Sequence, residues 1–409
     1  MGGGLRTIVT GSLLFYVQHL LGIGHLRRAL RIVDALAQEG IGVTLVSGGE
    51  PPPVLASPRA ERVLQLSPIK ARDAGFRELI DADGRPVDEN LWNIRRTALL
   101  SAFAAARPDA LLIEAFPFGR RAFRFELEAL IEAARSRRPR SRVLCSLRDV
   151  VVAPEDVTRC REIIRRVRTE FDFVLVHGDP AFIALAASFP LASQIADRLI
   201  YTGYVGDAAE ATSADEDAGV DEVLVSAGGG AVGGRLLRIA LETRRRGCLA
   251  GLKWRLLGGP NLPDAEFRAL AVDLPEGVIL ERFRADFPQM LRRCRVSVSQ
   301  AGYNTVLDIL EARAAAVVVP FAAHRETEQS LRAERLAAGE AIGLVRESEL
   351  SPERLAEEIN RVIARRPGSV AIDISGARRT AALIAAMIRS PTSIPGRRVE
   401  DFRCAGLAI

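Results

Sequence analysis

The chain of 409 residues is poor in several residue types, and each shortage argues against a class of function. Lysine occurs only at Lys70 and Lys253, aromatic residues make up 5% of the sequence, and the net charge is +5. The abundant arginines are interspersed with 51 acidic residues, and there are few aromatic side chains on which bases could stack. We therefore expect no nucleic acid among its partners.

Cysteine is also scarce, with five residues that are odd in number and far apart: Cys145, Cys160, Cys248, Cys294 and Cys404. This spacing predicts neither a disulfide framework nor a zinc site, so we expect a reducing compartment. The longest apolar stretch, residues 13–26, is interrupted by Gln18 and His19 and runs into arginines. It fits neither a signal peptide nor a membrane-spanning helix, and we expect a cytoplasmic protein.

The sequence is rich in short apolar runs that alternate with longer amphipathic ones, which is typical of parallel sheets covered by crossover helices. Strands are expected at residues 12–17, 42–47, 109–115, 142–147, 173–178, 222–227, 253–259, 277–283, 296–302 and 316–321. Amphipathic helices are expected, among others, at residues 25–40 and 124–137. The predicted class is α/β, with two Rossmann-like domains whose parallel sheets face each other across a cleft.

An acidic stretch without periodicity at residues 206–221 is predicted to be a linker. It separates a domain at residues 1–205 from a second at 222–375, and residues 376–409 form a terminal helix and tail. Ligands of open α/β sheets bind outside the carboxyl ends of the strands, so candidate site residues are sought there.

Three glycine-containing turns follow predicted strands and open predicted helices. They carry Gly22 and Gly24; Gly228, Gly229, Gly230 and Gly234; and Gly302. Such turns bring backbone N–H groups close to an anion, and the helix start adds a partial positive charge. No P-loop motif is present, and the second turn resembles a dinucleotide-binding loop but opens the second domain, which disfavours NAD.

The third turn, "SQAGYNTVLDILEA", allows two interpretations. Thr305 and Asp308 have the spacing of a capping box, which would be purely structural. Alternatively, Gly302, Asn304 and Thr305 offer polar contacts beside residues 324–329, which follow the next strand. A nucleotide sugar needs such groups, because its phosphates accept N–H donors and its ribose diol binds a carboxylate.

Several motifs together resemble the MurG-type glycosyltransferases of family 28, which have the GT-B fold. In the second domain these are "SAGGGAVGGR", "VILERFRADFPQML", "SQAGYNTVLDILEA" and "VVVPFAAHRETEQSLRAERL", and in the first "GIGHLRRAL". The stretches "FPFGRRAFRFEL", "SLRD" and "LVHGDP" are similar to a branch of predicted, uncharacterised glycosyltransferases. The resemblance covers most of residues 12–375 and implies an acceptor-binding first domain, a donor-binding second domain and a terminal helix that crosses back to the first.

The resemblance assigns the donor pocket residue by residue. Asp308 stands where the family usually has the Glu that binds the ribose diol, and Glu311 lies one turn further on. The remaining implied contacts are Glu328, Gln329 and His324 for the sugar, Arg282 and Phe283 for the uracil edge, and Gly228, Gly229, Gly230, Gly234 and Arg235 for the diphosphate, with Gly302, Asn304 and Thr305 beside them. Gly230 replaces a family serine, and Arg235 could equally be a solvated helix arginine.

On the acceptor side, His25 is the candidate general base because an imidazole titrates near neutral pH. His19 is a second candidate, and the alternative for His25 is a residue that caps or packs the helix start. Glu114 and Asp149 also stand at strand ends and could orient the base, bind acceptor, or cap a neighbouring loop. Gly22 and Gly24 would line the same acceptor side.

The implied reaction moves a sugar of hexosamine type from a UDP-sugar to an acceptor hydroxyl with inversion. No cofactor and no metal are expected, because helix starts and arginine can stabilise the departing diphosphate. A UDP-sugar 2-epimerase or a nucleotide-sugar hydrolase could use the same pocket, and so could a non-catalytic nucleotide-sugar-binding protein.

The acceptor implied by the resemblance is a glycan or a lipid-linked sugar of cell-envelope or polysaccharide biosynthesis. Peripheral membrane contact is one expectation for the first domain. It rests on the clusters Arg95-Arg96, Arg120-Arg121-Arg124 and Arg135-Arg137-Arg138 near Phe116, Phe118 and Phe123. The alternative is that these arginines lie on solvated helix faces.

Overall fold

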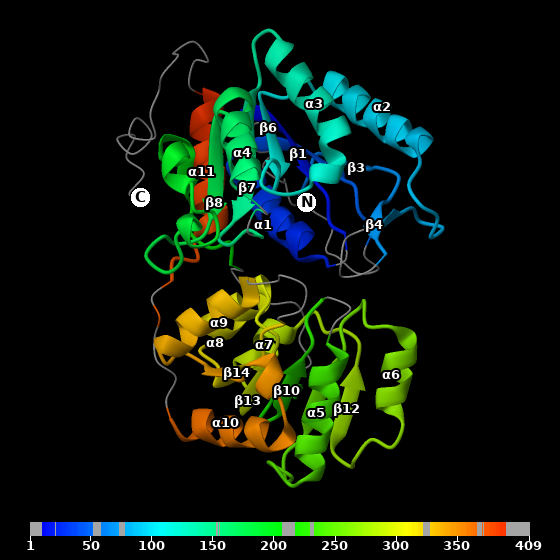
Figure 1. Ribbon diagram of the computed structural model, residues 1–409, viewed down its shortest axis with the longest axis vertical. Helices are drawn as coiled ribbons and strands as arrows, with labels where there is room; N and C mark the ends of the chain where they lie inside the picture. The colour runs from blue at the N-terminus through cyan, green and yellow to red at the C-terminus, as the bar shows by residue number, and fades with distance from the viewer. Residues whose placement is uncertain are drawn as a thin grey trace, which may run out of the picture. The chain divides into compact units, whose positions relative to one another are not determined.

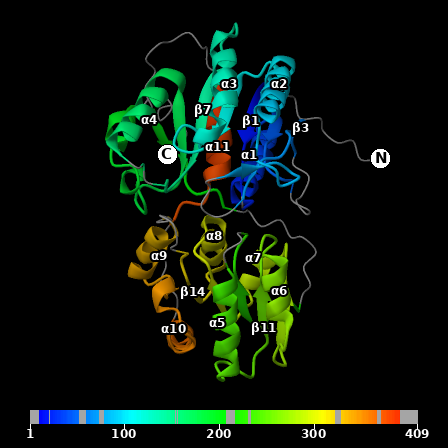
Figure 2. The same ribbon diagram turned by 45° about the vertical axis from the view of Figure 1, so that its right-hand side comes forward.

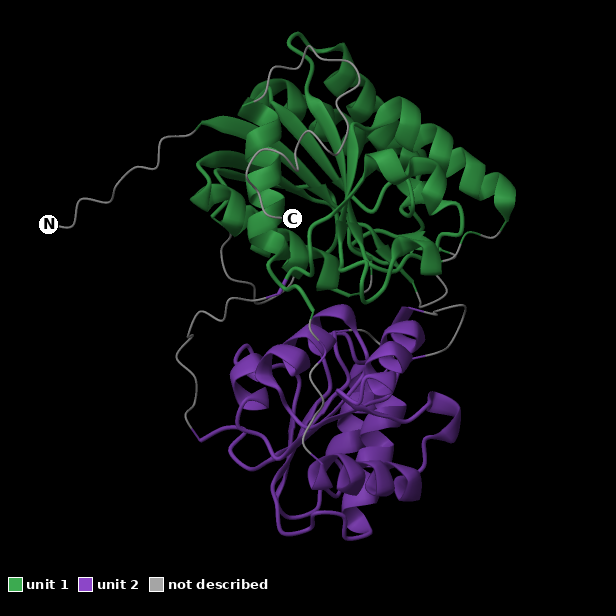
Figure 3. Ribbon diagram, turned by 90° about the vertical axis from the view of Figure 1, so that its left-hand side faces the viewer, with its two compact units in different colours: residues 1–205, 372–409 green, residues 206–371 purple. Residues whose placement is uncertain are grey.

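The structure, a computed structural model, divides into two compact units (Figure 3). Unit 1 comprises residues 1–205 and 372–409, and unit 2 comprises residues 206–371. The residues described are 10–20, 22–51, 59–72, 78–152, 154, 156–206, 217–229, 233–321, 328–365, 370 and 372–389. The chain returns to unit 1 at residue 372, a little before the boundary of 375 expected from the sequence, and most of the expected linker lies outside the described residues.

Unit 1 is built on a seven-stranded parallel sheet. Its strands, in spatial order, are β3 (Arg62–Gln65), β2 (Ile41–Ser47), β1 (Gly11–Val17), β6 (Ala110–Glu114), β7 (Arg142–Arg148), β8 (Phe173–His177) and β9 (Leu199–Tyr201). The central strands are apolar over nearly their whole length because both faces of the sheet are covered by helices. Between β3 and β6 in the chain, β4 (Lys70–Ala71) and β5 (Leu79–Ile80) form a separate two-stranded antiparallel hairpin.

The helices of unit 1 lie around its sheet (Figure 1), and alternate residues of β1 join different ones of them in the core. Leu13 and Phe15 join a core cluster with α1 (Gly24–Gln38) and α11 (Gly376–Arg389). Leu14 and Tyr16 join a second cluster whose helices are α2 (Glu89–Ala106), α3 (Arg124–Ser136) and α4 (Val157–Glu170). The terminal helix α11 therefore completes the core of unit 1 beside α1.

Unit 2 has a six-stranded parallel sheet. Its order is β12 (Val278–Glu281), β11 (Trp254–Leu257), β10 (Val223–Ser226), β13 (Val296–Ser299), β14 (Ala316–Val318) and β15 (Gly343–Leu344). One core cluster joins this sheet to α5 (Gly234–Arg245), α6 (Asp264–Ala271) and α10 (Pro352–Ala364). The remaining helices are α7 (Phe287–Leu291), α8 (Tyr303–Ala312) and α9 (Glu328–Ala338), and Figure 2 shows the unit from a second side.

The predicted α/β class with two parallel-sheet domains is confirmed, and every strand expected from an apolar run is present. The strands that the sequence did not indicate are the short or edge strands β3, β9 and β15 and the hairpin β4–β5. β3 is largely exposed, so it carries little of the apolar signal on which the prediction depended. Among the described helices, none combines the length and the apolar character needed to cross a bilayer.

Candidate active site

The candidate base His25 lies at the start of α1, opposite the carboxyl end of β6. Its Nδ1 atom is 2.9 Å from Oε1 of Glu114, and Arg28, one turn along α1, contacts the same oxygen. The side chains of Arg28 and Glu114 are 2% and 1% exposed, whereas that of His25 is 20% exposed. No side chain caps α1, whose N-cap residue is Ile23, so His25 is not a capping residue.

The hydrogen bond to Glu114 decides which nitrogen of His25 carries the proton. Nη2 of Arg28 also lies 3.2 Å from Nδ1, but it already donates to Oε1 of Glu114, and the carboxylate 2.9 Å from Nδ1 can only accept. Nδ1 is therefore the protonated nitrogen, and in a neutral imidazole Nε2 is then the unprotonated one. Burial raises the pKa of Glu114, but Arg28 and the His25 hydrogen bond outweigh it and hold this pKa well below its usual range. Glu114 is therefore a carboxylate, and Nε2 of His25 can accept a proton.

Burial lowers the pKa of His25 to about 3, and the Arg120 guanidinium adds to the effect. Arg120 is held in place by a hydrogen bond of 2.7 Å from its Nε to the carbonyl of Gln18. His25 is consequently neutral at physiological pH, which is the state that a general base requires.

This electrostatic arrangement predicts the pH dependence of the reaction. A base works only when unprotonated, so kcat/KM of the wild type should show no acid limb between about pH 5 and 8. Arg120→Gln removes a positive charge near His25 and should raise its pKa, so that an acid limb moves upward toward the ordinary value of about 6.5. A pH profile of kcat/KM that is identical in the two proteins would contradict the assignment.

Two residues that the sequence analysis did not single out complete this cluster. The Ser146 hydroxyl donates to Oε2 of Glu114, and Nε2 of His177 lies 3.0 Å from the Ser146 hydroxyl. Burial lowers the pKa of His177 to about 3. A usable signal was present, because Ser146 and His177 stand near the ends of two apolar strand runs.

The other acceptor-side candidates, His19 and Asp149, are both hydrogen-bonded within unit 1. Nε2 of His19 is 2.8 Å from the carbonyl of Glu50, and its ring packs so closely that a Cβ at Gly49 would lie 2.5 Å from it. Burial lowers the pKa of His19. The buried carboxylate of Asp149 accepts a hydrogen bond of 2.9 Å from the Tyr204 hydroxyl. Of the candidates on this side, the structure thus brings His25 and Glu114 together.

The glycines of the first turn lie at the start of α1, and those of the second turn follow β10 in unit 2. Gly24 is the first residue of α1, and Gly22 precedes it in the same turn. In unit 2, Gly228 has φ +71°, a left-handed conformation that favours glycine, and the carbonyl of Gly229 accepts 2.7 Å from the Asn261 side chain.

At the start of α5 the backbone lies close to its neighbours. A Cβ on Gly234 would lie 1.9 Å from the Glu266 carboxylate, and one on Gly233 would lie 2.0 Å from the Cβ of Ala227. Gly230 lies outside the described residues. The described part of the turn therefore leads directly into a helix start, where the unpaired N–H groups carry a partial positive charge.

The structure contradicts the capping-box interpretation of the third turn. α8 begins at Tyr303 with Gly302 in the N-cap position, and no side chain caps it. Thr305 therefore lies within the first turn, beside Asn304, and both are half-buried. Asp308 lies in the second turn and is 4% exposed.

The fallback carboxylate Glu311 is more exposed than Asp308. Its side chain is 21% exposed and lies 3.4 Å from the Arg292 guanidinium. Both acids are carried by α8, whose N-terminus adds a partial positive charge to the same edge of the sheet.

Glu328 and Gln329 begin α9 and are both engaged with the protein. Glu328 forms a buried ion pair of 2.9 Å with Arg332, which also donates to the carbonyl of Ala301, directly before the third glycine turn. The side-chain oxygen of Gln329 accepts 3.1 Å from the N–H of Phe321. These bonds tie the start of α9 to the turn that opens α8. His324 lies outside the described residues.

Arg282 and Phe283 follow β12 at the same edge. The Arg282 carbonyl accepts 2.8 Å from the N–H of Gly259, and its guanidinium donates to the carbonyl of Leu262 and stacks over the ring of Phe267. Phe283 is 39% exposed. An exposed aromatic ring at the carboxyl end of a strand is available for a flat ligand.

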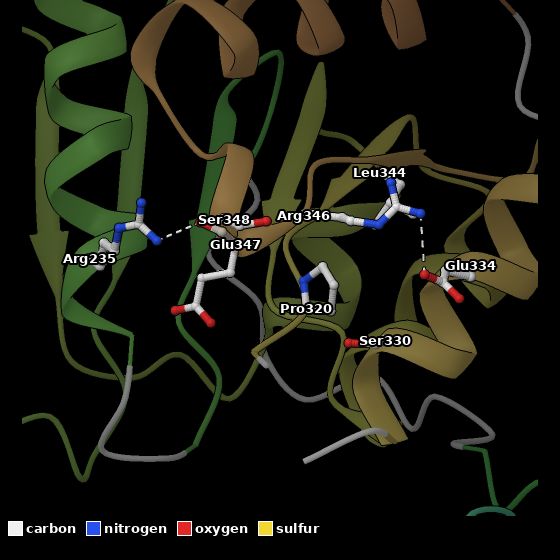
Figure 4. A pocket seen from close by; sticks show the side chains of 8 residues that line it. All are labelled: Arg235, Pro320, Ser330, Glu334, Leu344, Arg346, Glu347 and Ser348. Atoms are coloured by element: carbon white, nitrogen blue, oxygen red, sulfur yellow. Dashed lines mark hydrogen bonds and ion pairs between the residues drawn. The ribbon is translucent and has the colours of Figure 1, made fainter. Parts of the chain in front are cut away.

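Arg235 lines a pocket of about 460 Å³ in unit 2 (Figure 4). The other lining residues are Pro320, Ser330, Glu334, Leu344, Arg346, Glu347 and Ser348. Arg235 donates to the carbonyls of Glu347 and Leu350, and Arg346 pairs with Glu334 at 3.3 Å. Arg235 is exposed, and its guanidinium joins the start of α5 to the segment that carries these two carbonyls.

The described residues hold no group of three or more potential metal ligands. The sequence contains two Asp-x-Asp triplets, at residues 81–83 and 215–217, and closely spaced carboxylates of this kind can bind a divalent metal ion. In the first, Asp81 accepts the N–H groups of Asp83 and Arg85 within its own turn. The expectation of a metal-free reaction therefore rests on the helix starts alone.

The basic surface expected on unit 1 is wrong in part. Arg95 is 0% exposed and pairs with Glu126 in the core, and Phe116 and Phe123 are 2% and 0% exposed. Arg96 instead covers the half-exposed ring of Phe125 at 4.3 Å. Adjacent residues of an α-helix point about 100° apart, so Arg95 enters the core while Arg96 is only half-buried.

Residues 228–371 match the model of the glycosyltransferase family 28 C-terminal domain. The match includes both glycine turns of unit 2 and ends where the chain returns to unit 1.

Solved structures of similar fold are glycosyltransferases of the two-domain GT-B type. The calicheamicin glycosyltransferase CalG4 is 16% identical, with a TM-score of 0.55 over 94% of each chain. MurG of Acinetobacter baumannii is 17% identical, with a TM-score of 0.51 over 92% of this chain and 99% of that one. The spinosyn rhamnosyltransferase SpnG, complexed with thymidine diphosphate, is 17% identical, with a TM-score of 0.56 over 93% of this chain and 96% of that one.

Proposed function

We propose that this chain, whose residues 228–371 match the family 28 C-terminal domain, is a glycosyltransferase that moves a hexosamine-type sugar from a UDP-sugar to an acceptor hydroxyl, with inversion and without a metal. The observation that carries the proposal is the pairing of His25 with Glu114 at 2.9 Å, which leaves Nε2 of His25 as an available base. Unit 2 would bind the donor, and unit 1 would supply the base and bind a glycan or lipid-linked acceptor.

The proposed reaction is a single displacement at the anomeric carbon of the donor. Nε2 of His25 takes the proton of the acceptor hydroxyl while that oxygen forms the new bond to the anomeric carbon. The bond from the anomeric carbon to the diphosphate oxygen breaks, and both of its electrons leave with UDP. Attack from the side opposite the leaving group inverts the configuration.

The charge that develops on UDP would be stabilised by the unit 2 turns. The N–H groups at the starts of α5 and α8 and the partial positive charge of each helix favour the leaving diphosphate. These groups are fixed in the fold before the reaction, so they can stabilise the leaving group without reorganising, which is the role that a metal plays in other transferases.

The donor pocket is tested by calorimetry with UDP, TDP, GDP and NAD in metal-free buffer. TDP is included because a structural neighbour was crystallised with it. We expect UDP to bind most tightly and Asp308→Asn, which keeps the side-chain volume, to weaken binding about tenfold or more through the loss of a charged acceptor. Glu311→Gln is the matched control on the same helix and should change binding little.

The possible outcomes separate the assignments. A large effect of Glu311→Gln with none of Asp308→Asn would transfer the diol contact to Glu311. If no nucleoside diphosphate binds, or neither substitution weakens binding, the donor pocket is assigned to the wrong residues. Binding of UDP without turnover of any UDP-sugar would favour a non-catalytic binding protein.

A further inference from the structure

The cluster around Glu114 continues across the sheet of unit 1, away from His25. β6 and β7 are in register with Glu114 opposite Ser146, and β7 and β8 are in register with Ser146 opposite Leu175. His177 stands two residues beyond Leu175 and therefore on the same face of the sheet. Three neighbouring strands thus place a carboxylate, a hydroxyl and an imidazole side by side.

These positions interrupt an otherwise apolar face. Two residues earlier on the same strands, Leu112, Leu144 and Leu175 belong to the core cluster beneath α1 and α11. Glu114, Ser146 and His177 form the next row across these strands, and all three side chains are 1% exposed or less. A buried polar row of this kind lowers stability unless every member is hydrogen-bonded, and its members here are bonded to one another.

The bonds along the row have a single consistent direction. The carboxylate of Glu114 can only accept, so the Ser146 hydroxyl donates its one proton to Oε2. The Ser146 oxygen must then accept from His177, whose Nε2 lies 3.0 Å away and carries the proton. Nδ1 of the neutral His177 is left as an acceptor, 2.9 Å from the Thr202 hydroxyl.

The direction of these bonds sets the tautomers of both histidines. With Oε2 occupied by Ser146, the carboxylate presents Oε1 to Nδ1 of His25 and to Arg28. His25 is thereby fixed with its proton on Nδ1, and His177 with its proton on Nε2. The carboxylate cannot rotate away without breaking the bond to Ser146.

We propose that Ser146 and His177 are positioning residues, which hold the Glu114 carboxylate and, through it, the Nδ1–H tautomer of His25. This inference rests on the proposed function, in which Nε2 of His25 accepts the proton of the acceptor hydroxyl. Neither residue contacts the substrates; each acts through Glu114. A histidine with the wrong tautomer would present an N–H to the acceptor oxygen and could not take its proton.

The test is the ¹⁵N spectrum of histidine-labelled protein together with steady-state kinetics. The chain contains four histidines, so the His25 signals can be assigned from the His25→Ala variant. In the wild type at pH 7, Nε2 of His25 should give the signal of an unprotonated nitrogen. In Ser146→Ala the two tautomers should mix, and kcat should fall about tenfold while the KM for UDP-N-acetylhexosamine stays unchanged.

His177 is tested by a pair of substitutions that differ in one donor. His177→Gln keeps an N–H that can donate to Ser146, so it should retain the wild-type His25 signals and most of kcat. His177→Leu removes the donor and should behave like Ser146→Ala. This pair decides the question by itself if Ser146→Ala does not fold.

The matched control, Ser141→Ala, removes a buried hydroxyl of unit 1 that does not belong to the row of Glu114, Ser146 and His177. Ser141 is 0% exposed and donates 2.6 Å to the carbonyl of Pro108. Ser141→Ala should leave the His25 signals and kcat unchanged, whatever it costs in stability.

The outcomes distinguish this inference from the proposed function. Wild-type His25 signals and kcat in both Ser146→Ala and His177→Leu would overturn the positioning role, even if His25→Ala is inactive. An active His25→Ala would instead overturn the base assignment, while the tautomer change in Ser146→Ala, measured without substrate, would still be seen.

Discussion

Replacing His25 with alanine should lower kcat by about 10²- to 10⁴-fold, the usual contribution of a general base. The residual rate would come from substrate binding and from stabilisation of the leaving diphosphate in unit 2. UDP affinity should be unchanged, because the donor residues proposed here all lie in residues 206–371. The measurement is UDP release from UDP-N-acetylhexosamine with a panel of glycan and lipid-linked acceptors, combined with UDP calorimetry.

Chemical rescue provides the control for this prediction. Added imidazole should restore part of the rate of His25→Ala, because it can enter the space left by the side chain and take the acceptor proton. His19→Ala removes the other histidine of the same segment, which is buried and bonded to the Glu50 carbonyl, and imidazole should not rescue it. A His25→Ala protein with wild-type kcat would show that another group is the base.

The second large effect concerns stability. Arg95→Leu should lower the free energy of unfolding of unit 1 by about 3–5 kcal/mol, because it leaves the Glu126 carboxylate buried without its ionic partner. Both side chains are 0% exposed and are joined by bonds of 2.7 and 3.0 Å. Arg95 also donates to the carbonyls of Gly48 and Ser67, so two loops lose a donor as well.

Arg96→Leu is the matched control, since it removes the neighbouring arginine from the same helix. Arg96 stacks on the half-exposed ring of Phe125, so its loss should cost about 1 kcal/mol or less. Urea denaturation followed by hydrogen exchange at the amides of β1 and α2 reports on unit 1 specifically. Equal destabilisation by the two substitutions would contradict the buried ion pair.

The comparison of Arg95 with Arg96 shows what the local sequence could not reveal. Both residues belong to one basic pair in the sequence, and a charge cluster of this kind predicts an exposed surface. Arg95 instead becomes the centre of a buried network with Tyr16, Gln18 and Glu126, residues 31 to 79 positions away along the chain. Such partners are brought together only by the packing of α2 and α3 on the sheet.

The capping-box interpretation of the third turn failed for a related reason. The spacing of Thr305 and Asp308 satisfies the pattern, but the helix already begins at Tyr303, so Thr305 is too far inside it to cap its end. Helix boundaries depend on where the preceding strand stops and on how the turn packs, and a pattern of four residues does not contain that information.

The sequence by itself determined the α/β class, the parallel strands, the strand end at Glu114, and the helices after strands that carry His25 and Asp308. Apolar runs and helical periodicity are local properties, so they predict these elements without knowledge of the fold. The glycine turns and the family resemblance likewise predicted a glycosyltransferase.

Only the tertiary structure decided that Glu114 pairs with His25 while Asp149 binds Tyr204, and that Ser146 and His177 belong to the same hydrogen-bonded row. The partners come from neighbouring strands that are 31 to 32 residues apart in the chain. Which side chains meet is set by the register of parallel strands, and register arises from the packing of whole helices on the sheet rather than from any one segment.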